Sequence, residues 1–183
     1  MKNTHILLLY VCVLLFQQKR YHSMLPTFPI YPSNQDEVLV VKDAIRKRTQ
    51  SQTRLFELTD ESVAHAFHAR VPESLQDLQL IIVRPQVLWS IIFFKHTINR
   101  ARPKHVDPTL VALHSETADT PAYPSGHGFQ AYYLAHILSE RYPEKTQEFW
   151  ALAEDCAQCR VAAGLHYPSD NVFSRRLVDL FYV

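Results

Sequence analysis

Three short stretches carry side chains whose types and spacing could do chemistry on a bound anion. The first runs from Lys95 to Pro103 and contains Arg102. Lys95 and Arg102 are seven residues apart, which on one helix places them on nearly the same face, where both cations can approach one anion. Pro103 disfavours helical geometry at Arg102, so we expect that guanidinium to project from a helix end. Taken alone, a solvated basic helix end would explain this stretch better.

The second stretch is Pro124-Ser125-Gly126-His127, which precedes an apolar segment. The pattern predicts Ser125 and Gly126 at a helix N-terminus, where unpaired amides and the helix dipole favour an anion. His127 would then lie beside that anion. The ordinary alternative is an N-cap followed by a surface histidine.

The third stretch runs from Cys159 to Asp170. Its small residues predict a helix that presents Arg160 and, near its end, His166, while Pro168 forces a turn that lets Asp170 fold back. A carboxylate in that place can hold an imidazole in one tautomer and raise its basicity, as a nucleophile requires. The alternative is a structural histidine near a helix C-terminus.

Helices must position these stretches. The apolar periodicity and capping residues predict several of them. We expect a helix over residues 36–48, a second one capped at Thr59-Asp60 that ends at Arg70, and a third that begins at 72–74. Two buried helical pieces within 78–94, broken at Arg84-Pro85, should follow, and then helices over 126–142 and 144–166. We prefer two buried pieces to a membrane span for residues 78–94, because the arginine and the proline lie in the middle of that run.

The composition limits the fold and the classes of partner. The chain has 183 residues, 47% of them hydrophobic, and a net charge of +1, which suits one globular domain and provides no strongly basic surface for nucleic acid. Its three glycines all lie within two short stretches, which favours helices elsewhere. We therefore predict an all-α fold, a helical bundle.

The chain divides into three parts on composition. Residues 1–20 contain an apolar run of eleven residues, Ile6 to Phe16, too short for the about 20 that span a bilayer but typical of a secretory leader or a membrane-attached helix. Residues 21–35 are rich in proline and indicate a linker. Residues 36–183 form the expected catalytic domain.

Cys156 and Cys159 form a C-x-x-C pair. A zinc site needs about four ligands, and no partner pair with matching spacing is visible nearby. We therefore interpret the pair as two small buried thiols and predict no metal site.

Together and in this order, the three stretches resemble the signature of the type 2 phosphatidic acid phosphatase and vanadium haloperoxidase superfamily: K-x6-R-P, then P-S-G-H, then S-R-x5-H-x3-D. The resemblance implies a helical bundle that cleaves phosphomonoesters without a metal or other cofactor. It implies that five residues hold the phosphoryl oxygens: Lys95, Arg102, Ser125, Gly126 and Arg160. It also implies that His166 attacks phosphorus, Asp170 orients His166, and His127 protonates the leaving group.

Within this superfamily, the sequence His-Tyr-Pro-Ser-Asp at 166–170 resembles the acid phosphatase branch, whereas the haloperoxidases are far longer chains. Vanadate should still bind as a phosphate mimic. The expected partner is a small-molecule or lipid phosphomonoester, and a peripheral membrane contact through residues 6–16 is left open. The resemblance and the apolar leader together suggest a secretory, periplasmic or membrane-associated location.

Two features depart from the family pattern. Cys159 replaces the usual serine, a nearly isosteric change. After Asp170, relatives tend to have small residues, whereas this chain has bulkier ones from Asn171 to Val178, so we expect the last helix to be short or packed differently. A catalytically inactive phosphate-binding relative, a haloperoxidase and a Cys/His metal-binding module remain the alternative hypotheses.

Overall fold

The computed structural model describes residues 31–182, which are helical and contain no strand. The prediction of an all-α fold is therefore confirmed. In chain order the elements are α2 (Asn34–Lys47), α3 (Gln50–Thr59), α4 (Ala64–His68), α5 (Leu75–Ile82), α6 (Pro85–Ile98), α7 (Pro103–Val106), α8 (Gly126–Arg141), the 3-10 helix η1 (Pro143–Lys145), α9 (Thr146–Ala162) and α10 (Pro168–Phe181). The predicted leader lies outside the described residues, as does most of the linker.

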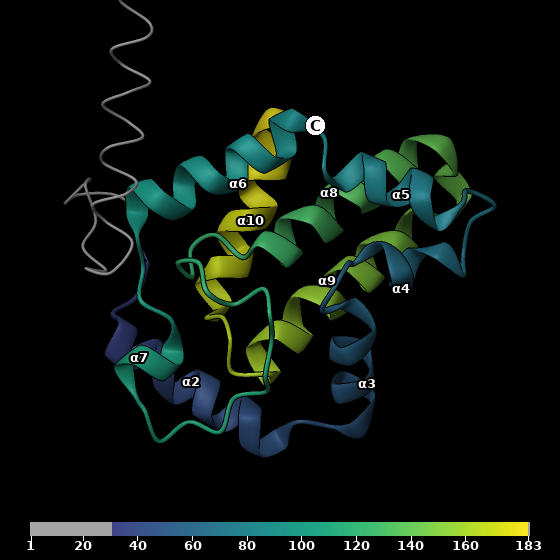
Figure 1. Cartoon of the computed structure of the whole chain (residues 1–183). Coiled ribbons are helices and arrows are strands. Elements are labelled where there is room, and N and C mark those ends of the chain that lie inside the picture. The colour runs from purple at the N-terminus through teal and green to yellow at the C-terminus, as the bar shows by residue number, and fades with distance from the viewer. Residues whose placement is uncertain (1–30, 183) are drawn as a thin grey trace, which may run out of the picture.

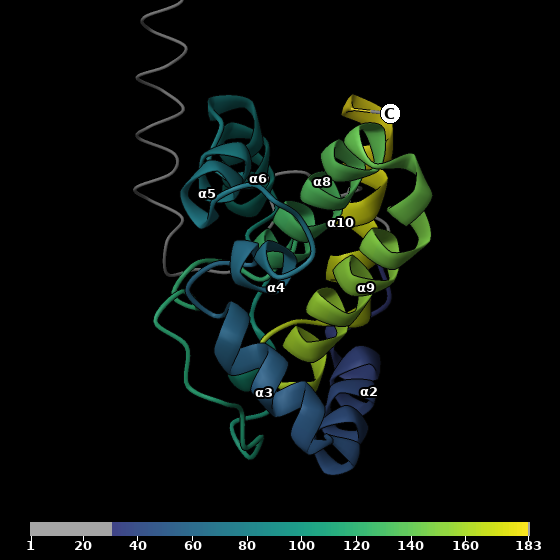
Figure 2. The same ribbon diagram turned by 90° about the vertical axis from the view of Figure 1, so that its right-hand side faces the viewer.

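Helix α8 is the centre of the bundle. It packs against α9 and α10, and the α5–α6 pair lies on its other side (Figures 1 and 2). Large side chains such as Phe129, Leu134 and Phe149 are fully buried in the main core cluster. Burial of each stabilises the fold by about 2 kcal/mol. The core therefore holds α8 in place, and with it the glycine-containing stretch at its N-terminus.

Local capping explains where several helices begin. Ser33 and Ser74 each accept a hydrogen bond from a backbone amide three residues later, which starts α2 and α5 close to the predicted positions. Pro85 occupies the first turn of α6, so the predicted break at Arg84-Pro85 is confirmed. The expectation of a short last helix is wrong, since α10 extends from Pro168 to Phe181 and packs on α8.

The predicted N-cap at Thr59-Asp60 is wrong. Thr49 and Gln52 form a capping box that starts α3 at Gln50, and this helix ends at Thr59. Thr59 donates its hydroxyl hydrogen bond to the Leu55 carbonyl within the last turn. The following helix is only the short α4, so Asp60 lies in a connection where its carboxylate can turn toward other elements.

Two helices expected to carry site residues end earlier than predicted. Helix α6 ends at Ile98, because Asn99 adopts the left-handed conformation with φ 52°. Arg102 is therefore not on the helix of Lys95. Helix α9 ends at Ala162, and Gly164, with φ +81°, turns the chain away. His166 consequently lies in the connection between α9 and α10.

Burial was predicted incorrectly for part of residues 78–94. Val87 and Ile91 face the core, but Leu88, Trp89 and Ile92 on the outer face of α6 are exposed. Within residues 31–182, no one helix is long and apolar enough to cross a membrane, although the pair Leu75–Ile82 and Pro85–Val106, bent by 48°, meets that criterion when taken together.

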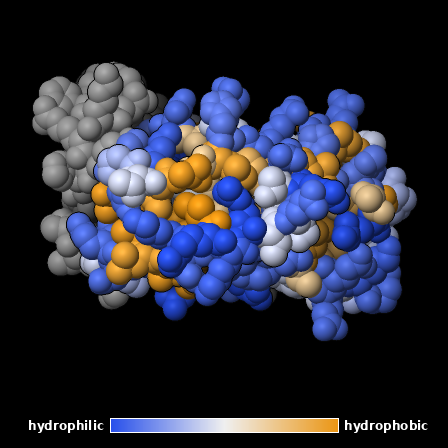
Figure 3. All heavy atoms as spheres, turned by 90° about the horizontal axis from the view of Figure 1, so that it is seen from below, coloured by the Kyte–Doolittle hydropathy of each residue, from blue (hydrophilic) through white to orange (hydrophobic). Residues whose placement is uncertain are grey.

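The end of the molecule formed by α2, α7 and the connection after α7 is also partly apolar. Seen from this end, apolar atoms gather in one half of the face, and the other half is mostly hydrophilic (Figure 3). Leu39, Val40 and Val111 are exposed apolar residues of these elements.

Candidate active site

His166 and Asp170 form a buried pair at the start of α10. Nδ1 of His166 lies 3.0 Å from Oδ2 of Asp170, which also accepts a hydrogen bond of 2.9 Å from the Tyr167 amide. Pro168 begins α10, so that the first turn directs Asp170 back to His166. A carboxylate can only accept when ionised, so Nδ1 carries the proton and Nε2 keeps its lone pair.

The surroundings keep this imidazole neutral. Burial lowers the pKa of His166 well below its usual value, and the positive charges of Arg102 and Lys95 lower it further. Burial raises the pKa of Asp170 to about 6, although Arg100 beside it opposes the rise. At neutral pH the pair therefore consists of a carboxylate and a neutral imidazole.

Arg102 and Lys95 converge on the same place from different elements. Arg102 Nη1 lies 3.1 Å from His166 Nε2 and donates to the Leu165 carbonyl at 3.0 Å, while its Nε donates to the Thr120 carbonyl at 2.8 Å. The Lys95 ammonium donates to the Pro121 carbonyl. Both cations are buried. Lys95 and Arg102 do converge, as predicted. They meet because both donate to adjacent carbonyls of the connection after α7, and not because they share one helix face.

The second stretch provides the N-terminus of α8, as predicted. Ser125 is the N-cap and accepts a hydrogen bond of 3.2 Å from the Gly128 amide, which leaves its hydroxyl proton for another acceptor. A Cβ on Gly126 would lie 3.7 Å from Lys95 Cε, so the Lys95 side chain lies against this helix terminus. The unpaired amides of the terminus and the ammonium thus face one region.

His127 is held by a backbone group. Its Nε2 lies 2.9 Å from the Asp60 carbonyl oxygen, which can only accept, so Nε2 carries a proton. Burial lowers the pKa of His127 to about 3, and the charge of Arg160 contributes. The substrate-free protein therefore has two neutral histidines in this region.

Arg160 lies in the last turn of α9 and pairs with Asp60. Its Nη1 donates to Asp60 Oδ1 at 2.7 Å, and its Nη2 donates to Ser115 Oγ at 3.2 Å. Burial acts to raise the pKa of Asp60, but the hydrogen bonds from Ser115 and Arg160 outweigh burial and hold that pKa below its usual value. Arg160 Nε is buried and has no hydrogen-bond partner within residues 31–182. That N–H is suited to an oxygen of a bound anion.

Sequence reasoning missed two contributors to this site. Asp60 gives no sequence signal, since its role depends on α3 and α9 lying side by side. Arg100 lies two residues before Arg102 and is fully buried, with its Nη1 2.7 Å from Asp170 Oδ1. A second arginine so close to the K-x6-R-P pattern was the available signal.

The combined arrangement is suited to an anion beside an imidazole that keeps its Nε2 lone pair. Three buried basic side chains, Lys95, Arg102 and Arg160, and a helix N-terminus surround the neutral His166, and burial together with the charge of Arg102 lowers the pKa of Lys95 well below its usual value. Like charges this close repel one another, and a phosphoryl group would offset that repulsion. Within residues 31–182, no group of three or more His, Cys, Asp or Glu side chains is placed to hold a metal ion, and Cys156 and Cys159 are buried free thiols.

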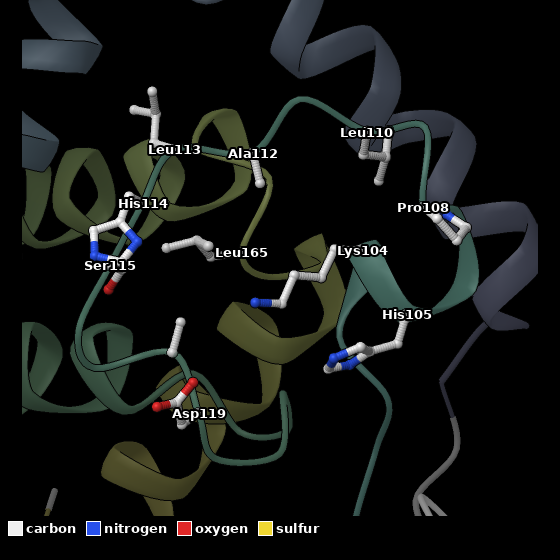
Figure 4. A pocket seen from close by; sticks show the side chains of 11 residues that line it. Lys104, His105, Pro108, Leu110, Ala112, Leu113, His114, Ser115, Asp119 and Leu165 are labelled. Atoms are coloured by element: carbon white, nitrogen blue, oxygen red, sulfur yellow. The ribbon is translucent and has the colours of Figure 1, made fainter.

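A pocket of about 470 Å³ lies next to this site, between α7 and the connection that follows it (Figure 4). Leu165, the neighbour of His166, and Ser115, the partner of Arg160, form part of its lining. The Lys104 ammonium points toward the middle of the pocket (Figure 4). The pocket therefore combines charged, polar and apolar side chains, and it lies beside His166 and Arg160.

One of the comparisons with known proteins identifies the family of this chain. No curated protein matches the chain. The model of the PAP2 superfamily matches residues 78–177, more than half of the chain, and this range includes all eight of the residues predicted for the site. The chain therefore belongs to the PAP2 superfamily, whose members generally act on phosphate esters.

Proposed function

We propose that this protein is a metal-independent phosphatase that hydrolyses phosphomonoesters through a phosphohistidine. The observation that carries the proposal is the His166–Asp170 pair with Nε2 beside Arg102. A carboxylate on Nδ1 makes Nε2 the nucleophilic nitrogen, and cations around it stabilise the charge of a phosphoryl group in transfer.

The reaction takes two steps. In the first, Nε2 of His166 forms a bond to phosphorus while the bond from phosphorus to the ester oxygen breaks, and His127 gives a proton to the departing alcohol. In the second, His127 takes a proton from water, the water oxygen attacks phosphorus, and the N–P bond breaks to release phosphate. His166 and His127 return to their starting states.

His127 must be protonated for the first step, although its pKa lies near 3 in the substrate-free protein. A phosphoryl group adds up to two negative charges beside the imidazole and would raise that pKa. Substrate binding and proton uptake by His127 are therefore coupled. The group that protonates the leaving oxygen becomes an acid only when the substrate is in place.

The other roles follow from position. Lys95, Arg102 and Arg160, with the Ser125 hydroxyl and the Gly126 amide, would hold the three phosphoryl oxygens. Arg160 Nε supports this assignment, because a buried donor without a protein partner needs an acceptor. The donor set consists of cations, amides and imidazoles, which suits a phosphoryl group without a metal.

A lipid phosphate is the favoured substrate over a water-soluble ester. Leu88, Trp89 and Ile92 form an exposed apolar face on α6, between about one and two turns before Lys95. An apolar face of this kind, with the apolar run at 6–16, would place the phosphate site close to a membrane surface. We therefore propose a membrane-associated location with peripheral contact through both segments.

The first experiment measures hydrolysis of an aryl phosphate from pH 4 to 8 with excess chelator, for the wild type and His166→Ala. His68→Ala is the matched control, because His68 is an exposed histidine on α4, outside the site. We expect chelator-resistant turnover that vanadate inhibits, that His166→Ala abolishes and that His68→Ala preserves.

Other outcomes identify the alternatives. A folded wild type that binds vanadate without turnover would indicate an inactive phosphate-binding relative, and bromide oxidation with peroxide would indicate a haloperoxidase. For the lipid substrate, co-sedimentation with vesicles that contain phosphatidic acid should weaken in Trp89→Ser. It should not weaken in Leu39→Ser, which removes an exposed apolar side chain from α2.

A further inference from the structure

A second buried charge cluster lies directly behind the His166–Asp170 pair. The Arg100 guanidinium donates from Nη1 to Asp170 Oδ1 at 2.7 Å and from Nη2 to Glu37 Oε2 at 2.7 Å. The side chains of Arg100 and Asp170 have no exposed surface, and that of Glu37 is 8% exposed. These contacts connect the Glu37 carboxylate of α2 to Asp170 through Arg100. Asp170 in turn contacts His166.

Further contacts fix the guanidinium in one orientation. Its Nε donates to Asn34 Oδ1 at 2.8 Å, and its Nη1 also donates to Ser169 Oγ at 2.7 Å. The rings of Tyr31 and Tyr167 lie 3.9 and 3.8 Å from its central carbon. An arginine held by four hydrogen bonds and two aromatic rings has little freedom, because its planar fork is already oriented.

Glu37 fixes the same turn of α10 from its other side. Its Oε1 accepts from the Ser169 amide at 3.0 Å, and its Oε2 accepts from the Ser169 hydroxyl. Ser169 directly precedes Asp170. Glu37 therefore holds both the backbone that carries Asp170 and the cation that pairs with it.

We propose that Arg100 is a positioning residue, which keeps Asp170 ionised and aimed at His166 Nδ1, with Glu37 as its anchor. This inference rests on the proposed function for its kinetic consequences, but the geometry of the pair can be tested without turnover. Arg100 contacts neither the phosphoryl group nor Nε2, so it acts only through Asp170.

The charge balance around Asp170 explains why an arginine is needed. Burial raises the pKa of Asp170, and Arg100 is the strongest influence in the opposite direction, ahead of Lys95. Other titratable groups surround this carboxyl group. They are Glu37 from α2, Lys95 from α6, His166 and Tyr167 before α10, and Tyr31 and Tyr123. Without Arg100, Asp170 would bind a proton near neutral pH and would lose the negative charge that makes it a strong acceptor for His166 Nδ1.

The test compares Arg100→Met, Arg100→Lys and Glu37→Gln with the wild type by aryl phosphate hydrolysis between pH 4 and 9. Arg70→Met is the matched control, because Arg70 forms its ion pair with Glu148 outside the site. Circular dichroism and thermal unfolding verify that each variant is folded.

We expect Arg100→Met to move the acid limb of kcat/KM up by about 1 to 3 pH units, the range by which an adjacent arginine lowers an aspartate pKa. Its kcat near neutral pH should fall about tenfold or more, with KM changed less than about threefold. Arg100→Lys should return the limb toward that of the wild type. Glu37→Gln keeps the arginine charge, so its limb should not move up. Arg70→Met should behave as the wild type.

A purely structural role for Arg100 would lower the unfolding temperature of Arg100→Met and leave its acid limb and kcat unchanged, which would overturn the proposal while the phosphatase function stands. If Arg100→Met does not fold, an unchanged kcat in both Arg100→Lys and Glu37→Gln would overturn it.

If the wild type has no phosphatase activity, the positioning role of Arg100 is tested by NMR of the His166 Nδ1 proton. Its downfield signal from the bond to Asp170 should be lost in Arg100→Met and kept in Arg70→Met, and its persistence in both would refute the positioning role.

Discussion

The two histidines of the site differ in what holds them. His166 donates to the side-chain carboxylate of Asp170, with Arg100 behind it, in a part of the protein that excludes solvent. His127 donates to the backbone carbonyl of Asp60, next to the Arg160 ion pair. A carboxylate adds basicity to the imidazole, whereas a neutral carbonyl mainly fixes its orientation.

In the mechanism that we propose, this difference separates two chemical tasks. A nucleophile needs its lone pair at every stage of binding, and the carboxylate partner provides that. A general acid must gain and lose a proton within each cycle, so a neutral partner leaves its pKa responsive to the charge of the substrate. The side chains behind each histidine thus indicate its role, and the following substitutions test that division from the largest effect to the smallest.

Asp170→Asn should have the largest effect on turnover. An asparagine can present its amide to Nδ1 and favour the wrong tautomer of His166, so we expect kcat to fall about 10³- to 10⁴-fold, as for comparable carboxylate–histidine pairs. Vanadate affinity should change little, because the cations remain. Steady-state kinetics and vanadate titration measure both, and a loss below tenfold would contradict the role of the carboxylate.

The pH dependence should show the same pair. Asp170 has a pKa raised to about 6, so its ionised fraction falls as the pH drops through that value. We expect kcat/KM for an aryl phosphate to decrease about tenfold per pH unit below about pH 6. Stopped assays in buffers of constant ionic strength test this, and a rate that stays constant down to pH 4 would show that Asp170 does not need its charge.

Asp60→Asn should have a smaller effect. The substitution removes the charge that pairs with Arg160 but keeps the backbone carbonyl that holds His127. Loss of one hydrogen bond to a charged group predicts a decrease in kcat/KM of about 10- to 100-fold. If Asp60→Asn reduced kcat/KM as much as Asp170→Asn, the two sides of the site would not differ as described.

Cys159→Ser should have almost no effect. The thiol donates to the Cys156 carbonyl at 3.1 Å, and burial raises its pKa to about 11, so it is neutral in any working range. A serine hydroxyl can make the same bond, and activity should stay within about twofold. A decrease in activity above tenfold would contradict this prediction and would show that the thiol has a role that its position beside Arg160 does not explain.

The sequence predicted which residues lie together better than it predicted the elements that carry them. Spacing placed His166 four residues before Asp170, and the turn at Pro168 made their contact predictable. The failure at Lys95 and Arg102 has a physical cause. The left-handed Asn99 ends α6, and no local rule requires an asparagine to take that conformation.

Asp60 and Arg100 were missed for a related reason. Each acts through a partner distant in sequence, Arg160 for Asp60 and Glu37 for Arg100, and such pairs depend on how the helices pack. The error in burial on α6 is similar, because Ile91 and Ile92 are the same residue type and only the packing on α8 decides that Ile91 is covered and Ile92 is exposed.

The carbonyl groups of Thr120 and Pro121 have a consequence for product release. They accept from Arg102 and Lys95 in the substrate-free protein, so these cations already have oxygen partners. Where a phosphate oxygen takes the place of one of these carbonyls, only the difference in free energy between the two hydrogen bonds contributes to affinity. We therefore expect inorganic phosphate to bind more weakly than the number of basic side chains in the site alone would suggest. Weak binding would let the product leave after each turnover.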